Sequence, residues 1–239
     1  MYAFRESWGA AEVALTARYA PDGTPLNLAL PGAPAAAVPG TDPVESLRRV
    51  AESFGHGAPV VGMRQVHGSE VVTIDEDWDG SEIEADGLVT ARADLVLLVR
   101  VADCLPVLLA DPDTGVVGVA HAGRVGMVLG VVPHTVGAMR ALGARDVRAW
   151  LGPRACGSCY EVPAAMQEQV RAQVPEAAST TAWGTPALDI AAGVRAQLDR
   201  AGVTWTDAGG CTIEDESWWS HRRQGAAAGR IGGLVRRCA

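Results

Sequence analysis

The chain has 239 residues, of which 48% are hydrophobic and 20% charged, a composition that predicts a folded protein with a large core and excludes an intrinsically disordered one. With 28 acidic and 20 basic side chains its formal net charge is −8, so it lacks the basic surface by which proteins hold a nucleic-acid backbone. Arg5 and Glu6 interrupt the apolar core of any signal peptide, and no later stretch has the length and apolarity of a membrane span. Five cysteines, an odd number in a chain of this size, indicate reduced thiols. We therefore expect a cytoplasmic protein with no nucleic-acid or membrane partner.

The predicted elements begin with a strand over residues 12–19 and a helix that starts at Thr41 or Asp42 with Pro43 and runs to about Phe54. Short apolar runs bounded by Gly, Pro or Asp turns predict six further strands, over residues 60–66, 70–74, 86–90, 94–102, 106–111 and 116–121. The remaining predicted elements are helices and a strand, over residues 126–142 (helix), 147–152 (strand), 163–174 and 187–201 (helices), with a mixed segment that ends at 231–235. This order predicts the α/β class, as a single compact domain over 1–239 with a mixed sheet core flanked by helices.

Three metal-ligating side chains stand where predicted strands end. They are His67 in "MRQVHG", Cys104 in "LVRVADCLP" and His121 in "VVGVAHAG". Because ligands bind beyond the strand ends of open α/β sheets, these residues are candidates for one shared pocket. Two imidazoles and a thiolate suit zinc or copper and leave a fourth tetrahedral position open, as catalytic zinc requires. The spacing alone equally allows a plainer interpretation, in which the histidines are hydrogen-bonded caps and the cysteine a core residue.

A series of motifs over residues 60–237 supplies a resemblance. "RQVHG", "DGLVT", "VRVADCLPVLLAD", "GVAHAG", "LGP" with "CYEV", and "CT" followed by "SHRR" and "GR" occur in the order seen in the YfiH-like laccase-domain family, whose members are also described as purine nucleoside phosphorylases or polyphenol oxidases. The resemblance implies a layered, cysteine-hydrolase-like α/β fold in which His67, Cys104 and His121 bind zinc and serve catalysis. It further implies phosphorolysis of adenosine, inosine or methylthioadenosine, adenosine deamination and, in a bacterial branch, peptidoglycan editing.

The two implied reactions need different groups in the active site. Deamination needs a water activated by the metal to attack the purine C6, whereas phosphorolysis needs cations that hold phosphate against the ribose. Copper is the alternative metal, because it outcompetes zinc for most such ligand sets. The expected partners are a small nucleoside and phosphate, for a monomer or small homo-oligomer. The candidates for substrate binding are Gln65, placed on the face of His67 by strand alternation, and Arg124, Arg222, Arg223 and Arg230.

The turn after His121 departs from the family pattern. The family continues His-Ala-Gly with Trp-Arg-Gly, whereas this chain has Arg124 and Val125 at those positions. The arginine has moved one place back, so we expect weaker phosphate binding and impaired phosphorolysis relative to deamination. In "ESWWSHRR", Trp and His221 stand where the family favours Phe and Tyr, and we expect these bulky residues to keep a stacking wall.

Other interpretations remain open at this point. One is a metal-free cysteine hydrolase or amidase, with Cys104 as nucleophile and His121 as base, acting on an amide such as a peptidoglycan precursor. Another is a non-catalytic binding protein stabilised by metal, which the open fourth position disfavours. A four-copper laccase is excluded, because five histidines with no two closer than 11 positions cannot supply its copper ligands.

The "CGSC" at 156–159 is a candidate redox pair, and no second C-x-x-C exists to complete a zinc ribbon. His56, His134 and Cys238 have no neighbours in sequence that suggest chemistry. We expect these three to be structural or surface residues.

Overall fold

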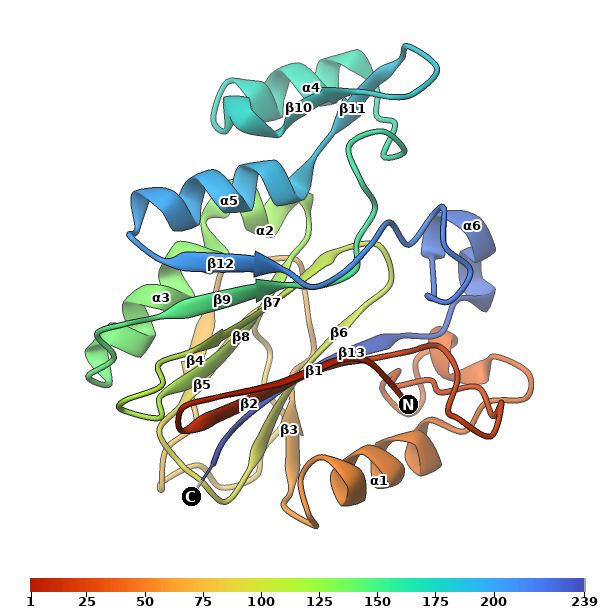
Figure 1. Cartoon of the computed structure of the whole chain (residues 1–239). Helices are drawn as coiled ribbons and strands as arrows, with labels where there is room; N and C mark the ends of the chain where they lie inside the picture. The colour runs from red at the N-terminus through yellow and green to blue at the C-terminus, as the bar shows by residue number, and fades with distance from the viewer. Residues whose placement is uncertain (239) are drawn as a thin grey trace.

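Two mixed β-sheets packed face to face form the centre of the molecule (Figure 1). The computed structural model describes residues 1–238. The first sheet has the strand order β1-β2-β13-β6-β3, with bounds Tyr2–Trp8, Ala11–Thr16, Ile231–Arg237, Val96–Val101 and Val60–Gly62. The second has the order β12-β9-β7-β8-β5-β4, with bounds Thr204–Asp207, Arg148–Leu151, Leu105–Ala110, Val117–Ala122, Gly87–Thr90 and Val71–Thr73. Each sheet contains both parallel and antiparallel pairs, so the predicted mixed sheet core is confirmed as two sheets.

Helices cover the outer face of each sheet, which gives four layers (Figure 1). Helix α1 (Pro43–Ser53) packs on the first sheet, and α2 (Arg124–Leu129), α3 (Val131–Ala141) and α5 (Ile190–Arg200) pack on the second. Both faces of the central strands are therefore buried. In β7, Leu105, Val107 and Leu109 face the helices while Leu108 and Ala110 face the other sheet. This two-sided burial explains why the strands read as continuous apolar runs instead of alternating ones.

The helix starts follow local chemistry. Asp42 caps α1 by accepting the backbone N–H groups of Val44 and Glu45 at 3.0 and 3.1 Å, and Pro43 occupies the first turn. The helix expected over 126–142 is divided into α2 and α3 at Gly130, whose φ of 82° is left-handed. A glycine at that position ends one helix and lets the next begin at an angle.

Several predicted boundaries were wrong, and β1 was not predicted at all. The strand expected over 60–66 ends at Gly62, because the following segment bends to reach the pocket described below. The helix expected over 187–201 begins at Ile190, after Asp189 accepts the Ala192 N–H at 2.9 Å, and residues before it form β11. The remaining elements are short, namely η1 (Pro34–Ala37), α4 (Ala164–Arg171), η2 (Pro175–Ala177), β10 (Ala178–Thr180), β11 (Pro186–Leu188), α6 (His221–Gln224) and η3 (Gly225–Ala227).

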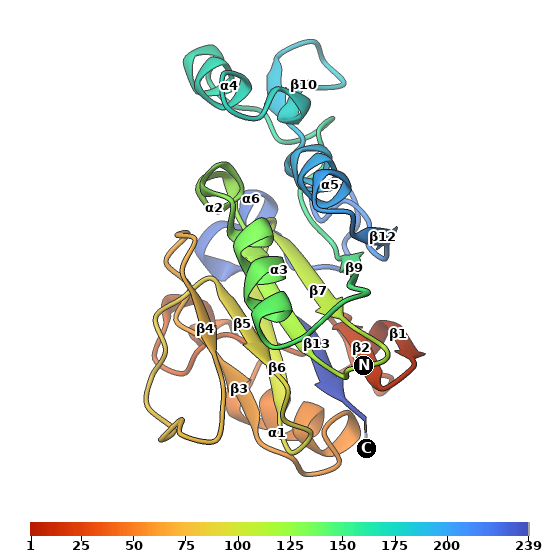
Figure 2. The same ribbon diagram turned by 90° about the vertical axis from the view of Figure 1, so that its left-hand side faces the viewer.

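The segment that carries α4, β10 and β11 projects from the two-sheet body (Figure 2). It leaves the second sheet after β9 and returns through α5 to β12, which pairs with β9 in parallel. None of the helices in residues 1–238 has the length and apolar character needed to cross a lipid bilayer.

Candidate active site and metal centre

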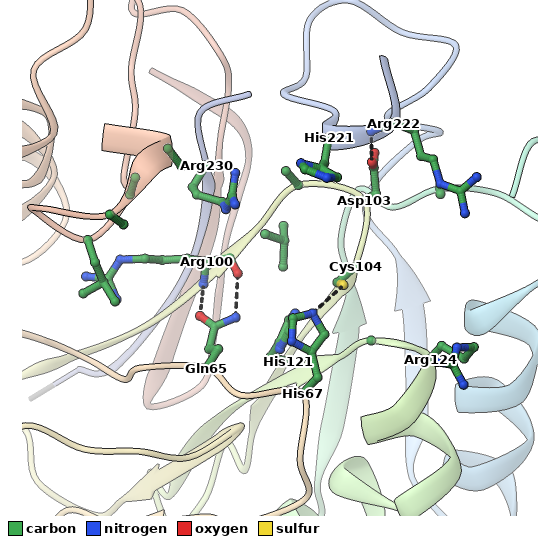
Figure 3. Close-up of a pocket in the computed structure, with 18 of the residues that line it drawn as sticks. Gln65, His67, Arg100, Asp103, Cys104, His121, Arg124, His221, Arg222 and Arg230 are labelled. Carbon is green, nitrogen blue, oxygen red and sulfur yellow. Dashed lines mark hydrogen bonds between the residues drawn. The ribbon is translucent and has the colours of Figure 1, made fainter. Parts of the chain in front are cut away.

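A cavity of about 510 Å³ opens where β6 and β8 end and β7 begins. That volume is within the range of small-molecule sites in proteins. Three chain segments supply the walls nearest the strands: the loop after β3, the loop between β6 and β7, and the end of β8. His67, Cys104 and His121 lie one on each of these segments and face the same space (Figure 3).

The three expected metal ligands converge. Their ligand atoms all lie within 4.8 Å of one another, and Cys104 Sγ is 3.8 Å from His67 Nε2. The rings of His67 and His121 meet edge to face with centroids 4.8 Å apart. The β7–β8 register, which pairs Leu105 with Ala122, brings Cys104 beside His121. Two imidazoles and a thiol grouped in this way form a donor set that fits zinc or copper.

The electrostatics of the set favour a thiolate. Burial would raise the pKa of the Cys104 thiol, but the imidazoles of His121 and His67 outweigh burial and lower the pKa to about 6. Burial would lower the pKa of His121, but Cys104 and Asp86 outweigh it and raise the pKa to about 9. Cys104 and His121 therefore form a thiolate–imidazolium pair near neutral pH, and the thiolate is the form that binds metals.

Asp86 is a further candidate site residue, which the sequence analysis did not name. Its carboxylate lies 2.7 Å from His121 Nδ1 and accepts the backbone N–H groups of His67 and Gly68 at 3.0 and 2.6 Å. One carboxylate thus orients one ligand and holds the loop of another, as outer-shell groups do in metal sites. Its place at the start of the motif "DGLVT", directly before β5, is the feature of the sequence that could have identified it.

The loop that carries His67 is conformationally unusual. His67 has a φ of 62°, a left-handed conformation that is uncommon for residues other than glycine. The hydrogen bonds to Asp86 hold this loop in place. His67 therefore lies beyond the strand on a bent loop, and not at the strand end as expected.

Asp103, which the sequence analysis did not name, connects the loop before Cys104 to the C-terminal part of the chain by hydrogen bonds. Its carboxylate accepts the Thr212 hydroxyl and the Arg222 backbone N–H, both at 2.6 Å. The φ of Asp103 is 82°, so this loop too is held in a left-handed turn. The Ala155 N–H donates to the Asp103 carbonyl at 2.9 Å, which adds a third segment to the same wall.

Three of the four candidate arginines line the cavity, namely Arg124, Arg222 and Arg230. Arg223 does not, because its guanidinium donates to the carbonyls of Ile213 and Trp218. The structure adds Arg100 to the lining. Figure 3 places Arg100 and Arg230 on one side of the two histidine rings and Arg124 and Arg222 on the other.

Gln65 lies in the cavity wall with its amide already engaged. Its Nε2 donates to the Arg100 carbonyl at 2.7 Å, and its Oε1 accepts the Arg100 N–H at 2.9 Å (Figure 3). The side chain thus pairs with β6 as a neighbouring strand would. Gln65 therefore positions the segment that leads to His67.

The structure shows where two segments that differ from the family pattern lie: the turn after His121, and the C-terminal segment with two tryptophans and His221. Arg124 is the first residue of α2, two residues earlier than the predicted start at Gly126, and Gly123 is its N-cap. His221 lines the cavity as expected. Trp218 and Trp219 belong instead to the core between the sheets, so the expected stacking wall contains His221 without them.

The C-x-x-C cysteines lie behind the cavity wall and are joined there by Cys211 and Glu214. Burial is the main cause that raises the pKa of both Cys156 and Cys159. A redox pair needs a thiol with a lowered pKa, so these two thiols do not have the properties of one. All five cysteines of the chain are free thiols in the structure.

The fold and the site define a layered α/β protein with a two-histidine, one-cysteine donor set in a cavity at the ends of its sheets. A family model described as multi-copper polyphenol oxidoreductase laccase matches residues 42–238. The chain belongs to this family, which confirms the resemblance inferred from the motifs.

Relatives and solved structures agree with this membership. The chain is 52% identical over 183 residues, 74% of each chain, to purine nucleoside phosphorylase ORF3 of Streptomyces griseus. It is 45% identical over 191 residues, 78% of this chain and 76% of the other, to a purine nucleoside phosphorylase of Mycobacterium tuberculosis. The fold is similar to those of the Neisseria meningitidis protein NMB0706, with TM-score 0.80, 26% identity and 99% of both chains covered, and of YlmD from Geobacillus stearothermophilus, with TM-score 0.80, 27% identity and 97% and 93% covered.

The copper chemistry in the family description requires more imidazole than this chain gathers. Within residues 1–238, the side-chain groups that could hold a metal contain two histidines, His67 and His121. A blue-copper site together with a trinuclear cluster needs many more. The donor set can hold one ion.

Proposed function

We propose that this chain is a zinc-dependent purine nucleoside enzyme that acts on adenosine, inosine or methylthioadenosine by phosphorolysis, hydrolytic deamination or both. The observation that carries the proposal is the convergence of His67, Cys104 and His121 on one cavity of about 510 Å³. The names of the relatives, purine nucleoside phosphorylase in each case, support the substrate class.

The residues fit zinc. Three protein donors leave a fourth position facing the cavity, and zinc held in this way supplies Lewis acidity and activates water near neutral pH. Asp86 fixes the His121 ring through Nδ1 at 2.7 Å, which leaves Nε2 for the metal. The Asp86 carboxylate that fixes the His121 ring also accepts the His67 backbone N–H at 3.0 Å, so one group positions both imidazoles, as outer-shell groups do in metal sites.

The arginines on the cavity wall are proposed to hold phosphate. The Nη1 of Arg100 is buried without a hydrogen-bond partner, and burial lowers the pKa of both Arg100 and Arg230. A phosphate bound in the cavity would offset the cost of burying these cations. The Arg222 guanidinium stacks on the Tyr160 ring at 4.9 Å and forms the opposite wall, where the base can lie against aromatic and planar groups.

The proposed balance between the two reactions depends on Arg124. In Figure 3 its side chain lies apart from Arg100 and Arg230, and Val125, where the family has arginine, is 37% exposed. We propose that phosphorolysis is impaired relative to deamination, by about ten- to a hundredfold in phosphate-dependent kcat/KM, the value of one charge-assisted contact.

The double variant Arg124→Trp, Val125→Arg tests this balance. Adenine release is measured across a phosphate titration and ammonia release in parallel. A rise in phosphate-dependent adenine release with unchanged ammonia release is expected. An unchanged phosphate dependence contradicts the proposed role of this turn.

The main test of the function uses adenosine. Wild-type protein reconstituted with zinc is expected to release adenine, ammonia or both, and His67→Ala and chelator-treated protein are expected to release neither while circular dichroism shows the fold intact. His56→Asn, at an exposed turn, is the matched control because asparagine tolerates the left-handed φ of 52° found there. Full activity of metal-free protein would overturn the zinc mechanism.

A second function is favoured by one specific observation. Asp86, His121 and Cys104 form a line of carboxylate, imidazole and thiolate, the arrangement of a cysteine hydrolase or amidase. If that function holds, zinc-free protein cleaves an amide such as a peptidoglycan precursor, and His67→Ala retains the activity while Asp86→Asn loses it. Zinc binding without turnover of any substrate would instead indicate the non-catalytic binding protein.

A further inference from the structure

A second group of potential metal ligands lies behind the cavity wall, outside the site described above. Cys156 and Cys159 come from the turn after β9, and Cys211 and Glu214 come from the loop after β12. One ligand atom of each residue lies within 4.8 Å of those of the others. Cys156 Sγ is 3.9 Å from Glu214 Oε2.

The two loops are built to present these side chains together. The Arg154 N–H donates to the Gly210 carbonyl and the Thr212 N–H to the Arg154 carbonyl, at 3.1 and 2.9 Å, so the loops pair in parallel just before the first cysteine. In the first loop, the Cys159 N–H donates to the Cys156 carbonyl at 3.0 Å and closes the C-x-x-C turn. In the second, the Asp215 N–H donates to the Cys211 carbonyl at 3.1 Å, which folds Glu214 back toward the sulfurs.

Contacts join the four groups across the two loops. The Cys156 backbone N–H points to Cys211 Sγ at 3.4 Å, so the sulfur of the second loop lies beside the start of the C-x-x-C turn. The sequence contains no second C-x-x-C, but Cys211-Thr-Ile-Glu214 supplies the same spacing with a carboxylate in the last place. Thiolate and carboxylate are both zinc ligands, and tetrahedral zinc separates its sulfurs by about 3.8 Å, so small side-chain rotations close the set.

We propose that Cys156, Cys159, Cys211 and Glu214 bind a second zinc ion whose role is structural. Four protein donors leave no position for substrate, which is the pattern of structural zinc. The ion would join the loop of Ala155 and Tyr160, both in the cavity wall, to the loop whose Thr212 hydrogen-bonds Asp103 at 2.6 Å. The second site would thus fix the cavity wall beside Cys104 without touching the reacting atoms.

The test is a count of zinc per chain in full-length protein purified under reducing conditions and dialysed against zinc-free buffer. Wild type is expected to retain about two ions, one for each ligand set. The triple variant Cys156→Ser, Cys159→Ser, Cys211→Ser is expected to retain about one, and so is the double variant Cys104→Ser, His121→Ala. Cys238→Ser, which removes a cysteine outside both sets, is the control and should leave the count unchanged.

Glu214 allows a milder test that does not depend on the folding of the triple variant. Glu214→Gln is expected to lose the second ion to a competing chelator at least tenfold more readily than wild type, while Glu214→Cys, which completes a four-cysteine set, is expected to retain it. A single zinc per wild-type chain that disappears in Cys104→Ser, His121→Ala overturns the proposal, as does a disulfide between two of the three cysteines in wild type purified in this way. These counts do not depend on the proposed catalytic function, because they need no substrate.

Discussion

The two ligand sets of this chain contain similar atoms in different surroundings. His67, Cys104 and His121 line the cavity and provide three donors. Cys156, Cys159, Cys211 and Glu214 provide four, and the loops that carry them form the back of the cavity wall. From this comparison we expect chemistry at the set with three donors, which leaves a position open to the cavity, and a structural role for the set with four, which leaves none.

The largest expected effect separates the two sets by function. Cys104→Ser should lower kcat/KM on adenosine by at least about 10³-fold, because it removes the activation of water, which lowers the barrier by several kcal/mol. Cys156→Ser should change kcat/KM by less than about tenfold but lower the Tm by about 5 °C, since one ligand of a structural ion is lost. Parallel kinetics and thermal melts measure both effects, and similar losses of activity in the two variants would contradict the division.

Asp86→Asn should weaken the first set alone. The amide keeps the size of the carboxylate but removes the charge opposite His121 and one acceptor for the loop of His67, and such outer-shell changes cost about 10- to 100-fold in metal affinity. Zinc competition titrations on Asp86→Asn and wild type give the value. An equal loss of zinc from the cysteine-rich set would show that the two sets are coupled.

The thiols of zinc-free protein should differ in their pH profiles. Because the pKa of Cys104 is lowered to about 6, its thiolate is present above that pH, and alkylation by iodoacetamide should rise with a midpoint near pH 6. The raised pKa values of Cys156 and Cys159 place their midpoints above the ordinary thiol value. At pH 7 Cys104 should react about tenfold faster.

Peptide mapping by mass spectrometry assigns each rate to its residue. Zinc reconstitution should protect Cys104, since a coordinated thiolate is a poor nucleophile. One common pH midpoint for all the thiols would contradict the electrostatic account of the first set.

The smallest effect is expected from a single methyl group beside each set. A Cβ on Gly123 would lie 2.9 Å from His67 Cδ2 and 3.2 Å from Cys104 Sγ, so Gly123→Ala should weaken zinc binding at the first set by about tenfold, at the low end of overpacking costs. A Cβ on Gly157, inside the C-x-x-C turn, would meet Ser179 Oγ at 2.7 Å and Asp189 Cβ at 2.8 Å, so Gly157→Ala must displace this turn. We expect it to weaken zinc binding at the second set and to leave the first unchanged, and loss of zinc from the first set in Gly157→Ala would contradict this separation.

Much of the fold could be predicted because local chemistry encodes it. The Asp42 cap and Pro43 mark the start of α1, and the continuous apolar runs mark strands buried on both faces. The division into two sheets could not be predicted, since β13 enters the first sheet between β2 and β6 from the far end of the chain, and a pairing so distant in sequence leaves no local periodicity. The strand β1 was missed for a different reason: it lies at the edge of the sheet, pairs within residues 1–238 only with the adjacent β2, and has no fully buried residue.

The ligand types, their order and the membership in a family can be recognised along the chain, because motif residues such as those around His67, Cys104 and His121 are contiguous in it. What those residues contact depends on the folded molecule. Folding placed Asp86 at 2.7 Å from His121, turned Arg223 toward backbone carbonyls and away from the cavity, and brought Cys211 and Glu214 to a C-x-x-C more than fifty positions earlier. Side-chain chemistry is local and can be read along the chain, whereas these contacts are set by sheet register and loop closure, which depend on how the whole core packs.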